Sequence, residues 1–581
     1  MDKRLDLRLN YCAILASFGQ NLLSMLPPAT SATPRESLKS GVRHGLQALS
    51  AAACTLRVEF LNRESYLTIA KSLWPAYLLA STLILWGFTW SLPSYYQDKS
   101  FQADENAAVW AVKQIHLPYH ISPRWFPWGT ALFYQVYFVK LIFKVGGLSQ
   151  PSDSWIIVMG RLVVFVSALG AITSIFLLGR KLFDTWTGQL AAIILAVLPG
   201  FVINGHYFKT DVPMTFWMLT TMLIAYKLMD SGNSAYLFLL GLLVGYTASV
   251  KYSGGLMFFV GLVAIAMASR KFHKPFSWVS YFLCVGLGFA FGEPAALWPG
   301  NWGEIIKALR WVGGLNRVGI PYYVARPAAW IDYFLNVMPF AMTLPMLVVA
   351  SLALSWVVGV CVLKRRKWEH LLIVTFLVVY YPLLATDNAR LVRYTVPLLP
   401  FAALLVASFV RSLRDRRLVG KIAVIGVSAL AAYAFLFSVS YVRVFAETDP
   451  RIQASRWVEE HILRGRPVPE IATGYLNLPQ LNLLGYETVL IHYNISDLQN
   501  TQSPYLIASE FSTSAYSQAL DYYPQQKSFF QFVTENFSEV VRFENSQELL
   551  FINSKRGSKL PDDWLHPNPR ITILVHRTGG H

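Results

Sequence analysis

Long apolar segments that recur along the chain limit the folds open to it. A helix needs about twenty predominantly apolar residues to cross a bilayer, and about eleven segments meet that criterion. They lie near residues 70–92, 160–180, 188–207, 212–229, 235–251, 254–270, 276–297, 330–363, 370–386, 391–411 and 421–441. The segment 129–146 is apolar but carries Lys140 and Lys144, so a position in the membrane interface is an alternative for it. The pattern predicts an α-helical polytopic membrane protein.

The composition agrees with this class. Charged residues make up 14% of the 581 residues and the mean hydropathy is +0.40, whereas a soluble chain would carry about a quarter charged residues. The net charge of +17 would suggest nucleic acid in a soluble protein, but here the basic residues fall in short loops between apolar segments. No nucleic-acid partner is expected. The four cysteines lack metal-ligand spacing, so neither a zinc site nor a disulfide framework is expected.

Alternate loops between the apolar segments are basic, which predicts the topology. These loops contain Arg180-Lys181, Lys227, Arg270 to Lys274, Lys364 to Lys367, and Arg411 to Lys421. Because positive loops stay in the cytoplasm, residues 1–66 are predicted to be a basic cytoplasmic tail, followed by the membrane domain 67–441. The first loop, 93–129, and everything after residue 441 then lie on the far side. A multi-pass cell membrane protein, of the bacterial inner-membrane type, is the expected setting.

The region 442–581 differs from the rest because it has mixed charge and no long apolar run. Thr488 to Ile491 and Tyr505 to Ala508 have the pattern of buried strands, and Arg451 to Leu463 that of an amphipathic helix. The region is predicted to be one small extracytoplasmic α/β domain.

Acidic and basic residues gather in the far-side loops. Adjacent carboxylates between membrane spans are costly unless they face water, a metal or a cationic substrate. Arginine and lysine suit a phosphate-bearing lipid, while a carboxylate serves acid–base chemistry. The candidates are Asp104 and Glu105 in the first loop; His206, Tyr207, Lys209 and Asp211; Lys251 and Tyr252; and Asp387, Arg390 and Arg393. We expect these groups to share one water-filled pocket.

Each candidate also has a purely structural interpretation. Asp104 and Glu105 could favour the N-terminus of the helix that follows, and Asp211 could cap the fourth span. Lys251 could extend to the headgroups. The two arginines could bind lipid phosphates nonspecifically, and His206 could be a structural hydrogen-bonding group.

With these elements in order, the chain resembles the GT-C class of membrane glycosyltransferases, particularly the branch with protein O-mannosyltransferases and lipid A aminoarabinose transferases. The resemblance spans about residues 70–470. It rests on Ala103-Asp104-Glu105, Ser122 to Phe126 with Trp128-Gly129, Gly160-Arg161-Leu162 to Leu178–Phe183, His206 to Phe216, Gly241 to Gly245 with Lys251-Tyr252, and Asn388-Ala389-Arg390 with Arg393-Tyr394 and Pro397 to Pro400.

The resemblance implies an inverting transfer of a sugar from a polyprenyl-phosphate donor to an acceptor hydroxyl on a glycan, lipid or protein. Asp104 would act as the base, with Glu105 beside it in the catalytic pair. The donor phosphate would be held by Lys209, Arg390, Arg393, Arg124 and Lys251. Asp211, His206, Tyr207 and Tyr252 would orient the substrates. Asp104, Glu105 and Asp211 could share Mg²⁺ or Mn²⁺, which only some relatives require.

The chain departs from the GT-C class in two respects. The class often has His or Lys beside the paired prolines after the first loop, where this chain has Arg124 and Phe126-Pro127. The chain also lacks the large β-trefoil inserts of eukaryotic protein O-mannosyltransferases.

Two other functions remain as alternatives. A transporter would place its charges near mid-membrane and show a repeat. A lipid-linked glycan polymerase or ligase would have its main far-side loop late in the chain.

Overall fold

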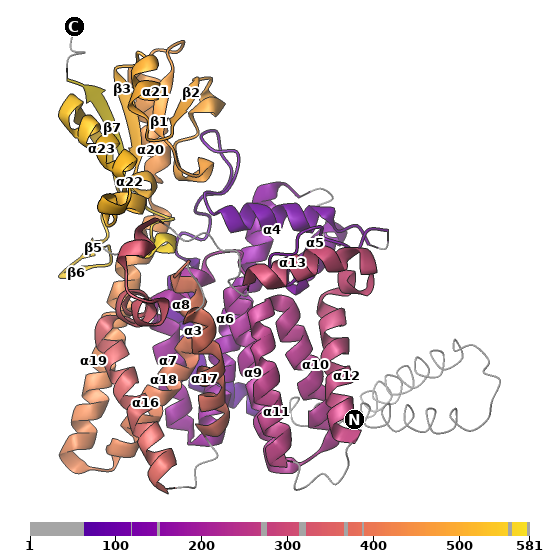
Figure 1. Ribbon diagram of the computed structural model, residues 1–581. Coiled ribbons are helices and arrows are strands. Elements are labelled where there is room, and N and C mark those ends of the chain that lie inside the picture. The colour runs from indigo at the N-terminus through magenta and orange to yellow at the C-terminus, as the bar shows by residue number, and fades with distance from the viewer. Residues whose placement is uncertain are drawn as a thin grey trace.

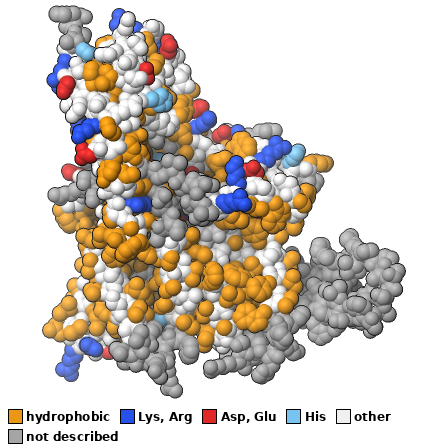
Figure 2. Space-filling view, viewed as in Figure 1, with side chains coloured by type: hydrophobic (Ala, Val, Ile, Leu, Met, Phe, Trp, Pro, Cys, Tyr) orange, Lys and Arg blue, Asp and Glu red, His pale blue; other side chains and the backbone are white. Residues whose placement is uncertain are grey.

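The computed structural model describes residues 63–117, 119–147, 151–268, 276–312, 321–364, 370–385, 389–555 and 560–577. The predicted tail 1–66 lies almost wholly outside these residues, as does Asp387. A bundle of helices stands below a small sheet domain (Figure 1). Hydrophobic side chains cover the visible face of the bundle, and charged side chains gather at its ends and on the sheet domain (Figure 2). This distribution is that of a multi-pass membrane protein.

Every predicted apolar segment has a helical counterpart. The helices of the bundle are α3 (Arg63–Leu85), α6 (Asp153–Leu182), α7 (Thr185–Val197), α8 (Pro199–Gly205), α9 (Asp211–Ser231), α10 (Ser234–Val250), α11 (Met257–Ala268), α12 (Phe276–Gly292), α14 (Ala329–Asp332), α15 (Met338–Met342), α16 (Leu344–Lys364), α17 (Leu371–Ala385), α18 (Leu399–Arg414) and α19 (Arg417–Val442). Among the described residues, five helices are long and apolar enough to cross a membrane, or up to seven with two bent pairs. Eleven spans therefore remain a prediction, as does the orientation of the termini.

Two of the predicted spans are broken. Helix α7 meets α8 at an angle of 63°, and Ala329–Met342 meets α16 at 116°. Pro199 begins α8; it lacks a backbone N–H and fits only the first turn of a helix. The break ends this span early, and the residues that follow α8 form the loop that carries Lys209.

Helices α10 and α12 pack closely because glycines line their contact. A Cβ atom at Gly245 would overlap the backbone of Val285, and one at Gly288 would overlap Leu242. Small residues let helices approach in a membrane, where dispersion contacts and not water exclusion favour association. This contact fixes the ends of α10 and α12, which lead directly into Lys251 and Glu293.

Two helices lie at the upper end of the bundle, α4 (Ala103–Gln114) in the first loop and α5 (Ala131–Val145) directly after it. Gln102 caps α4 by accepting a hydrogen bond from the Asp104 backbone N–H, so both adjacent acids occupy its first turn. Helix α4 lies across the top of the bundle, as does α13 (Trp302–Val312) (Figure 1). The apolar segment 129–146 corresponds to α5.

The C-terminal region contains a five-stranded sheet with the order β2-β1-β3-β7-β4. Strands β1 (Val468–Ile471), β2 (Thr488–Ile491) and β3 (Tyr505–Ser509) are parallel, whereas β7 (Ile571–His576) runs antiparallel to β3 and to β4 (Phe537–Phe543). The helices are α20 (Pro450–His461), α21 (Ile495–Asn500), α22 (Glu510–Ser517) and α23 (Pro524–Asn536), and a hairpin joins β5 (Glu548–Leu549) to β6 (Ile552–Asn553). The predicted small α/β domain, its two strands and its helix are confirmed.

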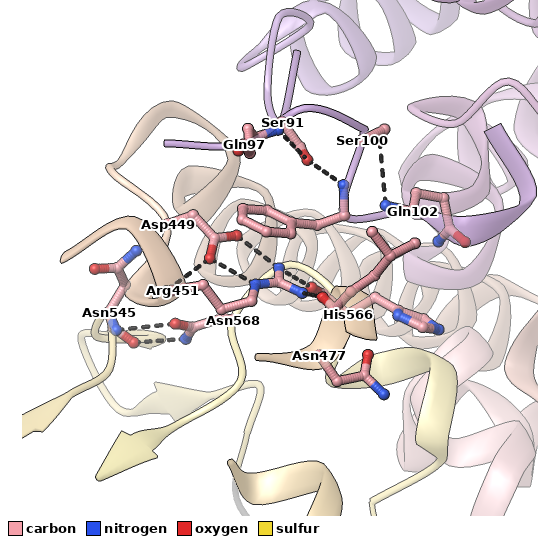
Figure 3. A network of polar contacts seen from close by, with 12 residues as sticks. Ser91, Gln97, Ser100, Gln102, Asp449, Arg451, Asn477, Asn545, His566 and Asn568 are labelled. Carbon is pink, nitrogen blue, oxygen red and sulfur yellow. Dashed lines mark hydrogen bonds and ion pairs between the residues drawn. The ribbon is translucent and has the colours of Figure 1, made fainter. Parts of the chain in front are cut away.

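A polar network centred on Arg451 lies within the sheet domain, where Arg451 also contacts Phe101 of the first loop (Figure 3). The Arg451 side chain donates to Asp449 and to the backbone carbonyls of Leu476 and His566, and its guanidinium lies 3.8 Å from the centre of the Phe101 ring. An arginine with every N–H group near a partner is stable when buried. The sheet domain is thereby held against the loop that carries Asp104.

Candidate active site

Asp104 meets two cations from distant parts of the chain. Its Oδ2 atom lies 3.2 Å from Lys209 Nζ and also contacts Arg393 Nη1. Lys209 belongs to the loop between α8 and α9, and Arg393 to the short helix η8 (Val392–Leu398) before α18. Burial raises the pKa of Asp104, but the nearby charges of Arg393 and Lys209 outweigh it and hold that pKa well below its usual range. Asp104 is therefore an ionised carboxylate.

A second ion pair lies in the same pocket. Lys251 Nζ is 2.5 Å from Asp211 Oδ1, and it lies 4.8 Å from the centre of the Tyr394 ring. Lys251 follows the last residue of α10, and Asp211 is the first residue of α9, so the ends of two helices place the pair. The structural role of Asp211 at a helix start and its place in the pocket are thus compatible.

One pocket contains six of the predicted residues. It is lined by Asp104, Pro127, Trp128, Lys209, Thr210, Asp211, Lys251, Tyr252, Ser253, Tyr380, Leu383, Leu384, Arg393 and Tyr394. The pocket thus combines two carboxylates and three cations with aromatic and aliphatic walls. Its charges suit an anion, and its walls suit the apolar or ring-shaped parts of a ligand.

Glu105 points away from this pocket although it is the neighbour of Asp104. Its side chain is fully buried, and both its oxygens pair with Arg161, at 2.8 and 2.7 Å. It also accepts hydrogen bonds from Ser100 Oγ and the Phe208 N–H. These contacts connect α4, α6 and the loop after α8. Glu105 was predicted as half of a catalytic pair, but the structure places it as an anchor that holds Asp104 and Lys209 in register.

Two predicted phosphate ligands also lie elsewhere. Arg390 Nη1 is 3.0 Å from Asp332 Oδ2, and its guanidinium lies 4.6 Å from the centre of the Tyr323 ring. Arg124 is exposed and has a φ of 55°. Within the described residues, neither side chain lines the pocket. A role for Arg390 and Arg124 in binding the donor phosphate therefore stays a prediction, with both side chains outside the lining of this pocket.

His206 and Tyr207 do not line the pocket, but Tyr207 contacts the pocket residue Lys209. The His206 ring lies against Phe445, with centroids 4.3 Å apart, and its nitrogens lie 3.0 and 3.1 Å from two backbone carbonyl oxygens. Burial lowers the pKa of His206 to about 4, so the ring is neutral at neutral pH. Lys209 Nζ lies 5.0 Å from the centre of the Tyr207 ring, which therefore supports the ammonium group.

Sequence reasoning missed residues that the C-terminal domain contributes. Asp563, in the short helix η13 (Asp562–Trp564), accepts hydrogen bonds of 3.0 Å from the N–H groups of Val392 and Arg393. His566 interacts electrostatically with Lys209 and Asp104, and its pKa is lowered to about 3, chiefly by burial. No local pattern marks these residues, because they reach the site only through the docking of the two domains.

Glu293 was also missed, although the sequence carried a signal for it. Its side chain is buried, and it accepts a 3.0 Å hydrogen bond from the hydroxyl of Tyr252, a pocket residue. An acid inside the apolar segment 276–297 is unusual and indicates a specific partner.

The three carboxylates suggested for a metal do not form a shared site. Glu105 is occupied by Arg161, Asp211 by Lys251, and Asp104 by two cations. No group of three or more His, Cys, Asp or Glu side chains within the described ranges is arranged to hold a metal ion. The donor set therefore does not fit Mg²⁺ or Mn²⁺, and the metal remains an untested prediction.

Comparison with known proteins identifies a related segment. Residues 135–298 match the family described as dolichyl-phosphate-mannose-protein mannosyltransferase. No curated protein matches the chain. The predicted resemblance is confirmed over this segment, which includes Lys209, Asp211 and Lys251 but neither Asp104 nor Arg393.

Two solved structures have a similar chain path. ArnT from Cupriavidus metallidurans bound to undecaprenyl phosphate has a TM-score of 0.46 and 11% identity, covering 88% of this chain and 98% of that one. The archaeal oligosaccharyltransferase AglB from Archaeoglobus fulgidus, in complex with an inhibitory peptide and a dolichol-phosphate, has a TM-score of 0.44 and 13% identity, covering 85% of this chain and 75% of that one.

Proposed function

We propose that this protein is an inverting glycosyltransferase that moves a sugar from a polyprenyl-phosphate donor to an acceptor hydroxyl. The single observation that carries the proposal is the meeting of Asp104 with Lys209 and Arg393. The family match of residues 135–298 supports it independently. A carboxylate beside two cations, at one end of an apolar bundle, combines a base with a site for a lipid phosphate.

Lys209 and Arg393 pair with Asp104 before the donor binds and with the donor phosphate afterwards. Asp104 pairs with both Lys209 and Arg393 and offsets one of their two positive charges. The donor phosphodiester carries one negative charge shared by two unesterified oxygens, so it can compete with the carboxylate for both cations. Once these cations turn to the phosphate, Asp104 loses the charges that lower its pKa and becomes a stronger base. Donor binding thus activates the carboxylate.

The transfer step conserves atoms and charge. Asp104 takes the proton of the acceptor hydroxyl while the hydroxyl oxygen forms a bond to the anomeric carbon. The bond from that carbon to the phosphate oxygen breaks, and the electron pair leaves with the polyprenyl phosphate. Lys209 and Arg393 stabilise the charge that develops on this leaving oxygen, and Lys251 lines the same pocket. Attack opposite the leaving group inverts the anomeric carbon.

The substitution Asp104→Asn tests the proposal because it should lower the rate of transfer without weakening the binding of polyprenyl phosphate. Loss of a general base lowers the rate by about 10²- to 10⁴-fold. The same change frees Lys209 and Arg393, so we expect the variant to bind polyprenyl phosphate at least as tightly as the wild type. Transfer is measured with a radiolabelled polyprenyl-phosphate sugar in membranes, and binding with polyprenyl phosphate and purified protein.

A matched control is Asp153→Asn. Asp153 is a half-exposed carboxylate at the start of α6, and it pairs with Lys113 outside the pocket. We expect this variant to retain full transfer. Undiminished transfer by Asp104→Asn would show that another group is the base, and weakened phosphate binding would contradict the competition for the two cations.

A further inference from the structure

A polar cleft lies in the sheet domain, apart from the pocket of Asp104. Its volume is about 760 Å³, and it is bounded by α22, the residues after β4, the β5–β6 hairpin and η13. Its lining includes Glu510, Ser514, Glu544, Gln547, Lys555 and Asp562. Nearly all the side chains on its walls carry hydrogen-bonding groups, whereas a lipid-tail site would be apolar.

The charges of this cleft are fixed and nearly balanced. Lys555 Nζ lies 2.6 Å from Glu510 Oε2 and 2.5 Å from Glu544 Oε1, and it donates to the Asn568 carbonyl. Glu510 Oε2 also accepts from the Arg570 N–H at 3.0 Å. Lys555 offsets one of the two glutamate charges, so the group offers acceptor oxygens with only a weak net attraction for an ion. It suits a neutral ligand with many hydroxyl groups.

Gln547 gives independent evidence for a missing polar partner. Its side chain is 4% exposed and lines the cleft, yet neither its Oε1 nor its Nε2 atom has a hydrogen-bond partner among the residues that the structure describes. Leaving a buried amide unpaired is unfavourable, because its groups have lost their hydrogen bonds to water. An amide presents one donor group and one acceptor group, and a saccharide hydroxyl can satisfy both.

The cleft lies beside the membrane domain. The β5–β6 hairpin lies near the upper end of α19 (Figure 1), and residues of both strands contact that helix. At the hairpin tip, Leu550 and Phe551 are 80% and 78% exposed. Two exposed apolar side chains next to a membrane helix favour insertion into the lipid interface. A head group anchored in the same leaflet could therefore enter the cleft.

The inner end of the cleft is connected to the catalytic pocket. Asp562 lines the cleft, and the adjacent Asp563 accepts hydrogen bonds from Val392 and Arg393, whose side chain contacts Asp104. Burial, together with the neighbouring Asp563, raises the pKa of Asp562 to about 7. Near neutral pH this carboxyl can both donate a hydrogen bond to a hydroxyl group and accept one from it.

We propose that this cleft binds the saccharide part of the acceptor. The inference rests on the proposed glycosyltransferase activity and deepens it, because it names a hydroxyl-rich acceptor and the domain that selects it. Such an acceptor has two sources, the head group of a membrane glycolipid and a water-soluble glycan, and the hairpin tip favours the glycolipid.

Two variants test the cleft. Ser514→Trp fills it, and Gln547→Leu removes both amide groups at similar volume. The assay measures transfer of labelled sugar from a polyprenyl-phosphate donor to two acceptor fractions from membranes of cells that lack this protein, namely intact glycolipids and their deacylated, water-soluble saccharides. We expect both variants to raise the acceptor KM by about tenfold or more, which corresponds to one or two lost hydrogen bonds. Binding of polyprenyl phosphate should be unchanged.

The matched controls are Ser496→Trp and Gln499→Leu on the exposed face of α21, which should leave the acceptor KM unchanged. Thermal unfolding checks that all four variants fold. If only the intact glycolipid is labelled, the acceptor must be anchored in the membrane; if both fractions are labelled, a free saccharide is sufficient. Either result supports the cleft as the acceptor site if the two cleft variants reduce the labelling. Wild-type kinetics in both cleft variants overturn the inference alone, whereas absence of transfer by the wild type overturns the proposed function and the inference with it.

Discussion

At the scale of single residues, two adjacent acids have different roles. Asp104 and Glu105 follow one another in the first turn of α4, where successive side chains point about 100° apart. One therefore enters the pocket and the other turns into the protein, toward Arg161. Sequence reasoning predicted catalytic roles for both because it recognised the pair but could not assign a direction to either.

The substitution Glu105→Gln distinguishes an anchor from a catalytic group. It leaves the buried Arg161 without a counter-charge, and breaking a buried ion pair costs about 3–5 kcal/mol. We expect a clearly lower unfolding temperature in detergent, measured by differential scanning fluorimetry. Asp104→Asn, at a partly exposed site, should lower this temperature less. Loss of transfer at an unchanged unfolding temperature would instead make Glu105 catalytic.

At the scale of helices, glycine positions set how closely the bundle packs. Gly241 and Gly245 of α10 face α12, and Gly288 of α12 in turn lies close to the backbone of α10. The apolar segments were predictable because each must match the thickness of a bilayer. The bends of 63° and 116° were not, because a break between apolar residues leaves the hydropathy pattern nearly unchanged.

The variants Gly245→Val and Gly286→Val test this packing. A side chain at Gly245 would overlap the backbone of α12, whereas one at Gly286 would meet nothing within 4 Å. Overpacking costs about 1–3 kcal/mol, so we expect only Gly245→Val to lower the unfolding temperature. It should also reduce transfer, because α10 leads into Lys251. Equal unfolding temperatures for the two variants would contradict the close packing of α10 on α12.

At the scale of the whole molecule, the sheet domain docks on the helices beside the candidate pocket. Trp564 packs on Tyr441 of α19 with ring centroids 4.3 Å apart, and Tyr441 donates a 2.8 Å hydrogen bond to its carbonyl. Beside it, Asp563 fixes the backbone of Arg393. The sheet domain is therefore both the proposed acceptor domain and a support for Arg393, the proposed donor-phosphate ligand.

The substitution Asp563→Asn tests this second role. It places an amide N–H group opposite the backbone N–H groups of Val392 and Arg393, so at least one hydrogen bond is lost. We expect transfer to fall by about tenfold and the affinity for polyprenyl phosphate to fall with it, as one displaced positioning contact would cause. Asp497→Asn, on an exposed turn of α21, is the control. Normal phosphate binding by Asp563→Asn would show that Arg393 is placed without the sheet domain.

The sequence by itself determined the class of this protein, the places of its helices, the existence of the C-terminal α/β domain and most of the charged pocket. These features follow from local patterns: apolar length, strand alternation and charge in loops. Only the tertiary structure decided that Glu105 and Arg390 turn away, that Arg161 neutralises a buried acid, and that Asp563 and His566 reach the site from the far end of the chain. Side-chain direction depends on contacts between residues dozens of positions apart, and domain docking on contacts between residues still farther apart, so no local pattern encodes them.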